Sequence, residues 1–348
     1  MIKITALVTA YNQKQYIEEA IESVLNQVCT FNFDVVVGDD GSDDGTWELL
    51  KEKYAHRENI RLIRMPRGEN TDNIGATRAS RIRLELLKYV TGEYFCFLDG
   101  DDFYSDSNKF QKQVNILDDV RQRECTICAS NMAIYREGDG GTFASPMYSY
   151  GKNAGRIEKH FCWKSTFFHA NACVFRSSII KKLPYDILDC VFNDHMIFFS
   201  ALVQGEVYYI SDITMYYRQV TTGSIWTSGD PVVSTIRGAM MADICNQIEP
   251  GLKKESNYRY RRNVYEIYSL RNTLDLDKLR YWYGLAKKLN CKTVMELFDY
   301  AQAPVYKKWV VSLKFYCRRC KYELPNVYRK TFAKVIGLLG YIKRLIIN

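Results

Sequence analysis

Residues 92–102 read GEYFCFLDGDD, and this stretch decides the fold of the chain. Its apolar run, Tyr94–Leu98, has the length and composition of a buried strand, and it ends in an acidic turn of Asp99, Gly100, Asp101 and Asp102. In open α/β sheets, ligands bind beyond the carboxyl ends of the parallel strands. The stretch therefore predicts a central sheet with a binding site at the edge where this strand ends.

Strand-like and helix-like segments alternate on the N-terminal side of this stretch. The expected strands cover residues 3–10, 33–38, 60–65 and 94–98, and the expected helices between them cover residues 17–25, 46–54 and 76–90. Alternation at this rhythm is typical of βαβ units. We therefore predict an α/β fold whose mixed, largely parallel sheet is flanked by helices.

The pattern changes after residue 102. Further strands are expected at 126–135, 171–176, 207–210 and 214–218, with a helix at 194–203. After Pro231 the chain becomes helical, with helices expected at 233–248, 258–273, 276–289 and 294–301. This shift predicts two domains, residues 1–228 and a helical C-terminal domain of residues 229–348.

Two more polar clusters follow expected strands, Thr9-Ala10-Tyr11-Asn12 after the first and Asp39-Asp40-Gly41-Ser42 after the second. Such residues are common in turns and caps, so one cluster alone is weak evidence. Three clusters at neighbouring strand ends favour a site on one rim of the sheet. If the chain stays extended there, Asp99 and Asp101 point the same way, and paired carboxylates suit Mg²⁺ or Mn²⁺.

Taken together, the motifs closely resemble family 2 glycosyltransferases of the GT-A fold, a Rossmann-like architecture found in enzymes of bacterial surface-polysaccharide assembly. Order and spacing match over residues 3–104, and the likeness returns at Asn193-Asp194 and Tyr216-Tyr217-Arg218. The motifs that carry it are VTAYN at 8–12, LNQ at 25–27, VGDDGSDDGT at 37–46, NIGATR at 73–78 and GEYFCFLDGDD at 92–102. The resemblance implies an inverting hexosyl- or N-acetylhexosaminyltransferase. Such an enzyme would move a sugar from a nucleotide-sugar donor, with a UDP-sugar expected, to a hydroxyl of a glycan or lipid-linked glycan.

The same resemblance implies which residues bind the donor and the metal. Asp101, with Asp99 beside it, is expected to hold Mn²⁺ or Mg²⁺, which would position the diphosphate and neutralise charge on the leaving group. Asp40, or alternatively Asp39, would accept a hydrogen bond from the uracil ring. Arg78 would flank the nucleotide, although a solvated helix arginine is the alternative. The expected donor-binding set is Ala10, Tyr11, Asn12, Asp39, Asp40, Arg78, Asp99, Gly100, Asp102 and Arg218.

An acceptor hydroxyl needs a base as it attacks, and the family places an Asp for this at the start of a late helix. Asp194 matches that position, although Asp is also a common helix N-cap. Asn193 stands where the family carries Glu, so a non-catalytic nucleotide- or glycan-binding homologue remains the alternative to an enzyme. Acceptor or lid contacts are expected from residues near this helix and from nearby rings: Asn193, His195, Trp163, His169 and Trp226.

Positive charge is concentrated in the C-terminal segment. The whole chain carries +8, but residues 305–348 hold eleven Lys or Arg against one acid, Glu323, so residues 1–304 carry −2. The apolar and basic helix expected at the end of this segment is too short to span a bilayer. It would lie on an anionic membrane surface or pack on protein, and nucleic acid is not an expected partner.

The cysteines indicate a reducing compartment. There are eleven, an odd number, and most lie in apolar runs, which favours buried thiols over a disulfide framework. The two CxxC pairs, at 125–128 and 317–320, are too far apart for the usual zinc motif. With no signal peptide or spanning segment expected, we predict a cytoplasmic protein, peripheral at the inner face of the cell membrane if the basic segment binds lipid.

Overall fold

A computed structural model describes residues 1–66, 75–136, 142–146, 154–157, 168–183, 185, 194–219, 231–249 and 276–302. The chain divides into two compact units, Met1–Asn263 and Val264–Asn348. The boundary predicted between residues 228 and 229 lies earlier in the chain than this division, because helix α9 (Pro231–Ile248) belongs to the first unit.

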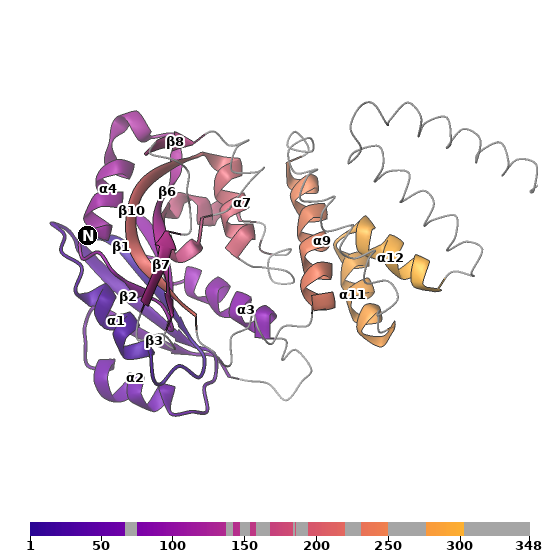
Figure 1. The fold of residues 1–348 in the computed structure, drawn as a ribbon, viewed down its shortest axis with the longest axis horizontal. Coiled ribbons are helices and arrows are strands. Elements are labelled where there is room, and N and C mark those ends of the chain that lie inside the picture. Colours follow the sequence, from indigo (N-terminus) through magenta and orange to yellow (C-terminus); the bar gives the residue numbers. More distant parts are fainter. Residues whose placement is uncertain are drawn as a thin grey trace, which may run out of the picture. The chain divides into compact units, whose positions relative to one another are not determined.

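The first unit is built around one 10-stranded sheet (Figure 1). The strand order is β3-β2-β1-β4-β9-β6-β10-β5, with β7 paired to β6 and β8 paired to β10. The strands are β1 (Ile2–Ala10), β2 (Asn32–Asp39), β3 (Ile60–Arg64), β4 (Tyr94–Asp99), β5 (Phe103–Tyr104), β6 (Cys125–Arg136), β7 (Thr142–Pro146), β8 (Gly155–Ile157), β9 (Cys173–Arg176) and β10 (Glu206–Gln219). The helices are α1 (Ile17–Leu25), α2 (Thr46–Tyr54), α3 (Gly75–Leu87), α4 (Lys109–Asp118), α7 (Asp194–Gln204) and α9, with 3₁₀ turns η1 (Val120–Gln122), η3 (Ala170–Ala172) and η4 (Ser177–Lys182).

Strands β1 to β4 are parallel. Helices cover both faces of this part of the sheet, which explains why its strands are continuous apolar runs in the sequence. Strand β9 is antiparallel to both β4 and β6, and β5 is antiparallel to β10. The sheet is therefore mixed, and the predicted α/β fold class is confirmed. The strand expected at 171–176 begins two residues later, because η3 occupies its start.

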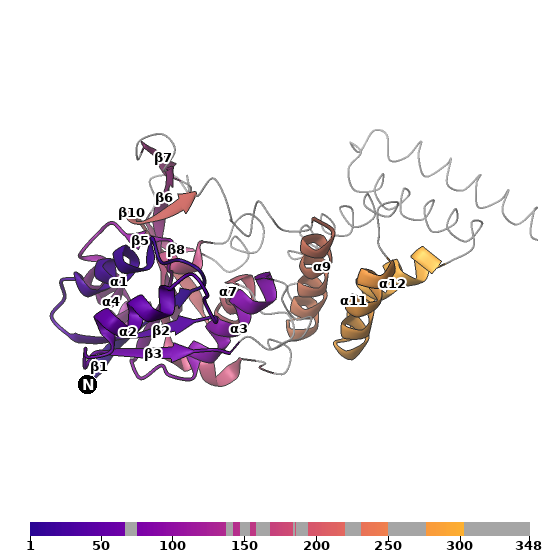
Figure 2. The same cartoon turned by 90° about the horizontal axis from the view of Figure 1, so that it is seen from below.

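Helices α1, α2 and α4 cover one face of the sheet (Figures 1 and 2). Phe33 of β2 packs edge-to-face on Phe110 of α4, with ring centroids 5.4 Å apart. Tyr54 of α2 donates a hydrogen bond to Glu22 of α1 over 3.0 Å, which joins the two neighbouring helices.

Helices α3 and α7 cover the opposite face, since alternate residues of a strand point to opposite sides. Gly38, five residues after Phe33, faces α3 so closely that a Cβ there would lie 2.8 Å from Ile82 and Leu86 side-chain carbons. Phe198 of α7 packs against Phe175 of β9. The two faces thus carry different helices, and the rim at the carboxyl ends of β1 to β4 lies between them.

Strand β10 corrects the prediction of two short strands at 207–210 and 214–218. It is one strand of 14 residues whose pairing with β6 shifts twice in the middle. Tyr209 pairs with Ala129 and Ile213 with Asn131, so the bend inserts extra residues into β10 without ending it.

The second unit contains α11 (Leu276–Lys288) and α12 (Lys292–Gln302), which pack on each other. Trp282 is buried and Tyr283 stacks on Phe298 with centroids 4.1 Å apart. The helix expected at 258–273 and the basic segment 305–348 lie outside the described residues. Within the described part, no helix is long and apolar enough to cross a membrane.

The cysteines of the described part are free thiols, and all but Cys29 are buried. Cys125 and Cys128 lie in β6, as expected of a buried strand. The second CxxC pair, at 317–320, lies outside the described residues.

Candidate functional site

Backbone hydrogen bonds join the carboxyl ends of β1 to β4 into one rim. The Asp40 N–H donates to Ala10 O, the Gly100 N–H to Thr9 O and the Met65 N–H to Asp39 O, each over 2.8 Å. The structure therefore brings the three polar clusters predicted from the sequence to the same edge of the sheet.

The acidic stretch at the end of β4 is a tight turn. The Asp102 N–H donates to Asp99 O over 2.9 Å, which closes the turn across four residues. The expectation that Asp99 and Asp101 share one side of an extended strand is therefore wrong, because strand geometry ends at Asp99. Asp99 and Asp102, at the first and last positions of the turn, lie close together instead.

Gly100 is required in this turn by its close approach to β1 and α1. A Cβ at this position would lie 2.5 Å from Gln13 Oε1, 2.7 Å from Ile17 Cδ1 and 2.8 Å from Thr9 O. A glycine therefore lets the turn sit directly on the end of β1, which brings its carboxylates onto the rim.

Asp99 is held by two side chains. Its Oδ1 accepts from Thr9 Oγ1 over 2.9 Å and from Arg83 Nη2 over 2.5 Å. Arg83, on α3, was missed by sequence reasoning, which chose Arg78. Arg78 also falls in α3, but its side chain lies outside the described residues. The sequence signal that could have identified Arg83 is that it lies among the apolar residues of α3, the helix that packs on β2.

Asp102 is the most deeply buried acid of the turn, with 2% of its surface exposed. Its Oδ1 accepts from the Arg218 N–H over 3.0 Å, and its Oδ2 accepts from Asn171 Nδ2 over 2.8 Å. Burial raises the pKa of Asp102 well above its usual range, and the charges of Asp101 and Asp99 add to this. Burial, with the charge of Asp99, likewise raises the pKa of Asp101 to about 6. Three acids in one turn therefore repel one another, and a bound cation would relieve that repulsion.

Asp99, Asp102 and His169 form a group with ligand atoms that all lie within 4.8 Å of one another. Two carboxylates and one imidazole fit a divalent cation such as Mn²⁺, whereas Mg²⁺ prefers oxygen ligands alone. Asp101, the metal ligand expected from the sequence, is outside this group among the described residues. His169, expected only as a sugar or acceptor contact, joins it from the residue before η3.

At the end of β2, Asp39 is fully buried and its carboxylate hydrogen-bonds the loop that follows it. Its Oδ1 accepts from the N–H groups of Gly41 and Ser42 over 3.1 and 3.0 Å, with Arg64 Nε 3.5 Å away. Its Oδ2 is buried and has no hydrogen-bond partner among the described residues. Asp40 is also buried, at 3% exposed.

Asn12 ties the loop after β1 to the loop after β2. It has a positive φ of 50°, which Asn tolerates better than most residues. Its Nδ2 donates to Asp43 Oδ1 over 2.8 Å, and its Oδ1 accepts from the Asp43 N–H over 3.0 Å. Tyr11, 38% exposed, and Asn12 are exposed residues of this loop, while Ala10 is buried.

Arg218 is buried and hydrogen-bonds the acidic turn. Its Nε donates to Asp101 O over 2.8 Å, and its Nη2 pairs with Glu19 of α1. The guanidinium lies 4.8 to 5.1 Å from three ring centroids, those of Tyr16, Tyr135 and Phe103. With its side chain only 5% exposed, Arg218 contacts protein groups here, whereas the sequence predicted contact with the donor.

The remaining expected site residues are described in part or not at all. Asp194 and His195 begin α7, but their side chains lie outside the described residues. Asn193, Trp163 and Trp226 also lie outside them. The roles expected for these five residues therefore remain predictions.

Comparison with known proteins identifies similar chains. A family model described as "Glycosyl transferase family 2" matches residues 5–184. An uncharacterized protein of Mycobacterium tuberculosis is 28% identical over 220 residues, which cover 63% of this chain and 59% of that protein. A chondroitin synthase of Escherichia coli is 30% identical over 196 residues, 53% of this chain and 26% of that protein. This chain thus spans less than two thirds of the length of these relatives.

A crystal structure of S. aureus TarS in complex with UDP-GlcNAc has the same fold. Its TM-score is 0.56 with 18% sequence identity, and the match covers 83% of this chain and 80% of that chain. At this identity the likeness concerns the fold.

Proposed function

Because the chain belongs to glycosyl transferase family 2 and has the GT-A fold, we propose that it transfers a sugar from a nucleotide-sugar donor to a hydroxyl group of a glycan or lipid-linked glycan. The donor we propose is a UDP-sugar, and the transfer inverts the configuration at the anomeric carbon. TarS, a protein of the same fold crystallised with UDP-GlcNAc, and the chondroitin synthase among the relatives support a UDP-sugar donor and a glycan acceptor.

One observation carries this proposal most directly: Asp99, Asp102 and His169 gather at the rim where strands β1 and β2 also end. A donor diphosphate needs a cation beside it and a nucleotide pocket next to that cation. The loops at Asn12 and Asp39 are joined through Ser42 and start at the same sheet edge as the acidic turn, which supports a nucleotide site beside the proposed cation.

In the proposed reaction, this chain's residues bind and orient the donor. The loop from Ala10 to Asn12 and the carboxylates of Asp39 and Asp40 would hold the nucleotide. The orphaned Oδ2 of Asp39 is an acceptor suited to a ring N–H, so Asp39 becomes as good a candidate as Asp40 for the base contact. Asp99, Asp102 and His169 would hold Mn²⁺ or Mg²⁺, with Asp101 beside them; when bound, the cation neutralises charge on the departing diphosphate.

Proton transfer is assigned to Asp194. A carboxylate at the start of α7 would take the proton from the acceptor hydroxyl as its oxygen forms a bond to the anomeric carbon and the diphosphate leaves. The assignment rests on the resemblance described above, and its partner at the preceding position is Asn193.

The test is a screen of UDP-, GDP- and dTDP-sugars with purified protein and Mn²⁺, following release of free nucleotide. We expect slow hydrolysis of one UDP-sugar and faster release with a glycan acceptor. Asp194→Asn should lower turnover by about 10²–10⁴ while leaving donor affinity unchanged. Asp299→Asn, an exposed position of α12, is the matched control and should be silent.

One outcome would contradict the proposed activity, and another would contradict only the role of Asp194. Donor binding by the wild type without hydrolysis or transfer of any nucleotide sugar would favour a non-catalytic binding protein. Full turnover in Asp194→Asn would leave the transferase reading intact and remove Asp194 from the role of base.

A further inference from the structure

Gln113, on the buried face of α4, makes three hydrogen bonds although it is fully inaccessible to solvent. Its Nε2 donates to Cys128 O over 2.8 Å and to Ala172 O over 3.0 Å, and its Oε1 accepts from Lys109 Nζ. Both amide hydrogens and the amide oxygen are therefore used, and the side chain joins α4 to β6 and η3.

The carbonyl of Ala172 is the last of η3, and it receives a second hydrogen bond from Ser130 Oγ over 2.8 Å. One residue of the candidate metal site and one hydrogen-bond partner of that site lie just before it in the chain. His169 immediately precedes η3, and Asn171 within it donates to Asp102. The two bonds to Ala172 O therefore anchor the segment that carries His169 and Asn171.

Lys109 fixes which way the Gln113 amide faces. It is fully buried, and its Nζ lies 4.9 Å from the Tyr104 ring centroid. An ammonium group can only donate, so it must meet Oε1 and thereby turns Nε2 toward the two carbonyls. A flipped amide would place Nε2 against the ammonium and Oε1 against Cys128 O and Ala172 O, which removes all three bonds.

We propose that Gln113 is a positioning residue for the metal site: by holding Ala172 O, it keeps His169 and Asn171 beside Asp99 and Asp102. This inference rests on the divalent cation of the proposed function. Gln113 touches none of the candidate ligands, so it acts through the placement of η3. Groups bonded directly to metal ligands typically change metal affinity by about 10–100-fold when removed, and Gln113 lies one step further out, so we expect the low end of that range.

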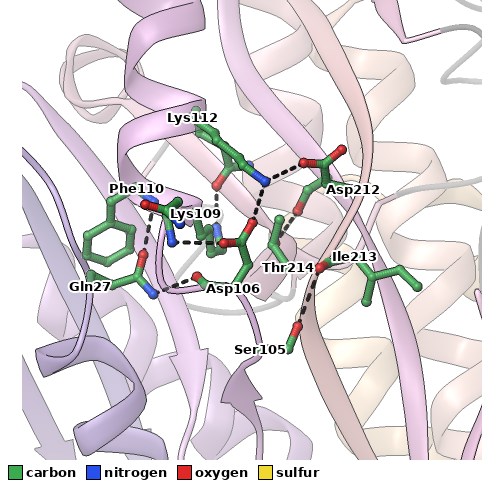
Figure 3. Close-up of polar contacts among 12 residues, drawn as sticks. Gln27, Ser105, Asp106, Lys109, Phe110, Lys112, Asp212, Ile213 and Thr214 are labelled. Carbon is green, nitrogen blue, oxygen red and sulfur yellow. Dashed lines mark hydrogen bonds and ion pairs between the residues drawn. The ribbon is translucent and has the colours of Figure 1, made fainter.

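The experiment compares Gln113→Met with Gln27→Met. Gln27 is a matched control because it is also a buried glutamine with three hydrogen bonds. Its Nε2 donates to Ser23 O and Asp106 O, and its Oε1 accepts from the Phe110 N–H of α4; the last two bonds appear in Figure 3. Its bonds fix the start of α4 to α1 and do not reach η3. The two variants thus lose equal numbers of hydrogen bonds, and only one loses the anchor of the metal site.

Mn²⁺ binding is measured on each full-length variant by the decrease of the free-ion electron paramagnetic resonance signal, and melting temperature is measured in parallel. Both variants should melt below the wild type. Gln113→Met should bind Mn²⁺ about tenfold more weakly, whereas Gln27→Met should stay within about twofold of the wild type. Raising Mn²⁺ to saturation should restore nucleotide-sugar turnover in Gln113→Met, as expected for a defect of metal placement.

Ser130→Ala provides a milder test at the same carbonyl if Gln113→Met does not fold. It removes the Ser130 Oγ bond to Ala172 O and should weaken Mn²⁺ binding by about threefold. Equal Mn²⁺ affinity in wild type, Ser130→Ala and any folded Gln113→Met would overturn the positioning role alone. A wild type that binds no Mn²⁺ would instead overturn the metal site of the proposed function, and this inference with it.

Discussion

Asp102→Asn should stabilise the metal-free protein and at the same time abolish its response to metal. The substitution keeps the size of the side chain and removes one of three carboxylates from the turn. An Asn at 102 can still accept from the Arg218 N–H. Asn171 can rotate its amide, since Asn171 Oδ1 is buried without a hydrogen-bond partner among the described residues and would then accept from the new Nδ2.

The size of the stabilisation follows from the burial of Asp102. At pH 7.5 the wild type must either bury a charge beside Asp99 and Asp101 or protonate a carboxyl whose pKa is raised. Removing that cost should gain about 1–2 kcal/mol, part of it offset by the weaker bond from Arg218. For a chain of this size, that corresponds to a rise in melting temperature of about 1–3 °C.

The metal response is measured by thermal denaturation with and without Mn²⁺. At a concentration of about 100 Kd, a ligand that binds only the folded state adds about 2.7 kcal/mol to the wild type. Loss of one ligand of three should weaken binding at least about hundredfold, so the Mn²⁺-induced shift should disappear in Asp102→Asn. Asp106→Asn is the control: Asp106 lies outside the site, paired with Lys112 (Figure 3), so this variant should melt earlier and keep the full Mn²⁺ shift. A lower metal-free melting temperature in Asp102→Asn, or an unchanged Mn²⁺ shift, would refute the reasoning.

Three more outcomes can be checked. Gly100→Ala should destabilise the protein by about 2–4 kcal/mol in urea denaturation, because its Cβ would overlap Gln13, Ile17 and Thr9 O; a loss below about 0.5 kcal/mol would contradict the close approach. Glu19→Gln should lower the free energy of unfolding by about 1 kcal/mol, a small value because Glu19 is half-exposed and its ion pair with Arg218 is partly screened by solvent. It should also weaken Mn²⁺ binding slightly through Arg218. Unchanged stability would mean that the ion pair contributes nothing. As the pH falls from 7.5 to 5, the metal-free protein should become more stable and its Mn²⁺ affinity should fall. The reason is that the pKa of Asp101 is raised to about 6 in the folded state, which therefore takes up a proton at a higher pH than the unfolded chain does. A melting temperature that does not change over this pH range would rule out the raised pKa.

The parallel half of the sheet was predictable because its strands are buried on both faces and read as continuous apolar runs. Three features of the site were not predictable from the sequence. Strand periodicity predicted that the side chains of Asp99 and Asp101 share one side of the strand. The turn, closed by the Asp102 N–H, instead brings Asp102 beside Asp99. The motif directed attention to Arg78 as a nucleotide contact, and nothing in it indicated that Arg83 would contact Asp99. No local pattern marks His169 as a metal ligand, because it lies just before a 3₁₀ turn that is far along the chain from Asp102.

Strand β10 reaches from β8 at one end to Arg218 at the site, and the bulge in its middle separates two registers. In a regular strand, an insertion of one residue turns every later side chain to the opposite face of the sheet. Here an insertion near Ser211 would fall where the ladder is already irregular, and the pairing from Met215 onward could be kept. Insertions or deletions at this bulge can therefore be tolerated during evolution without moving Arg218 away from the acidic turn.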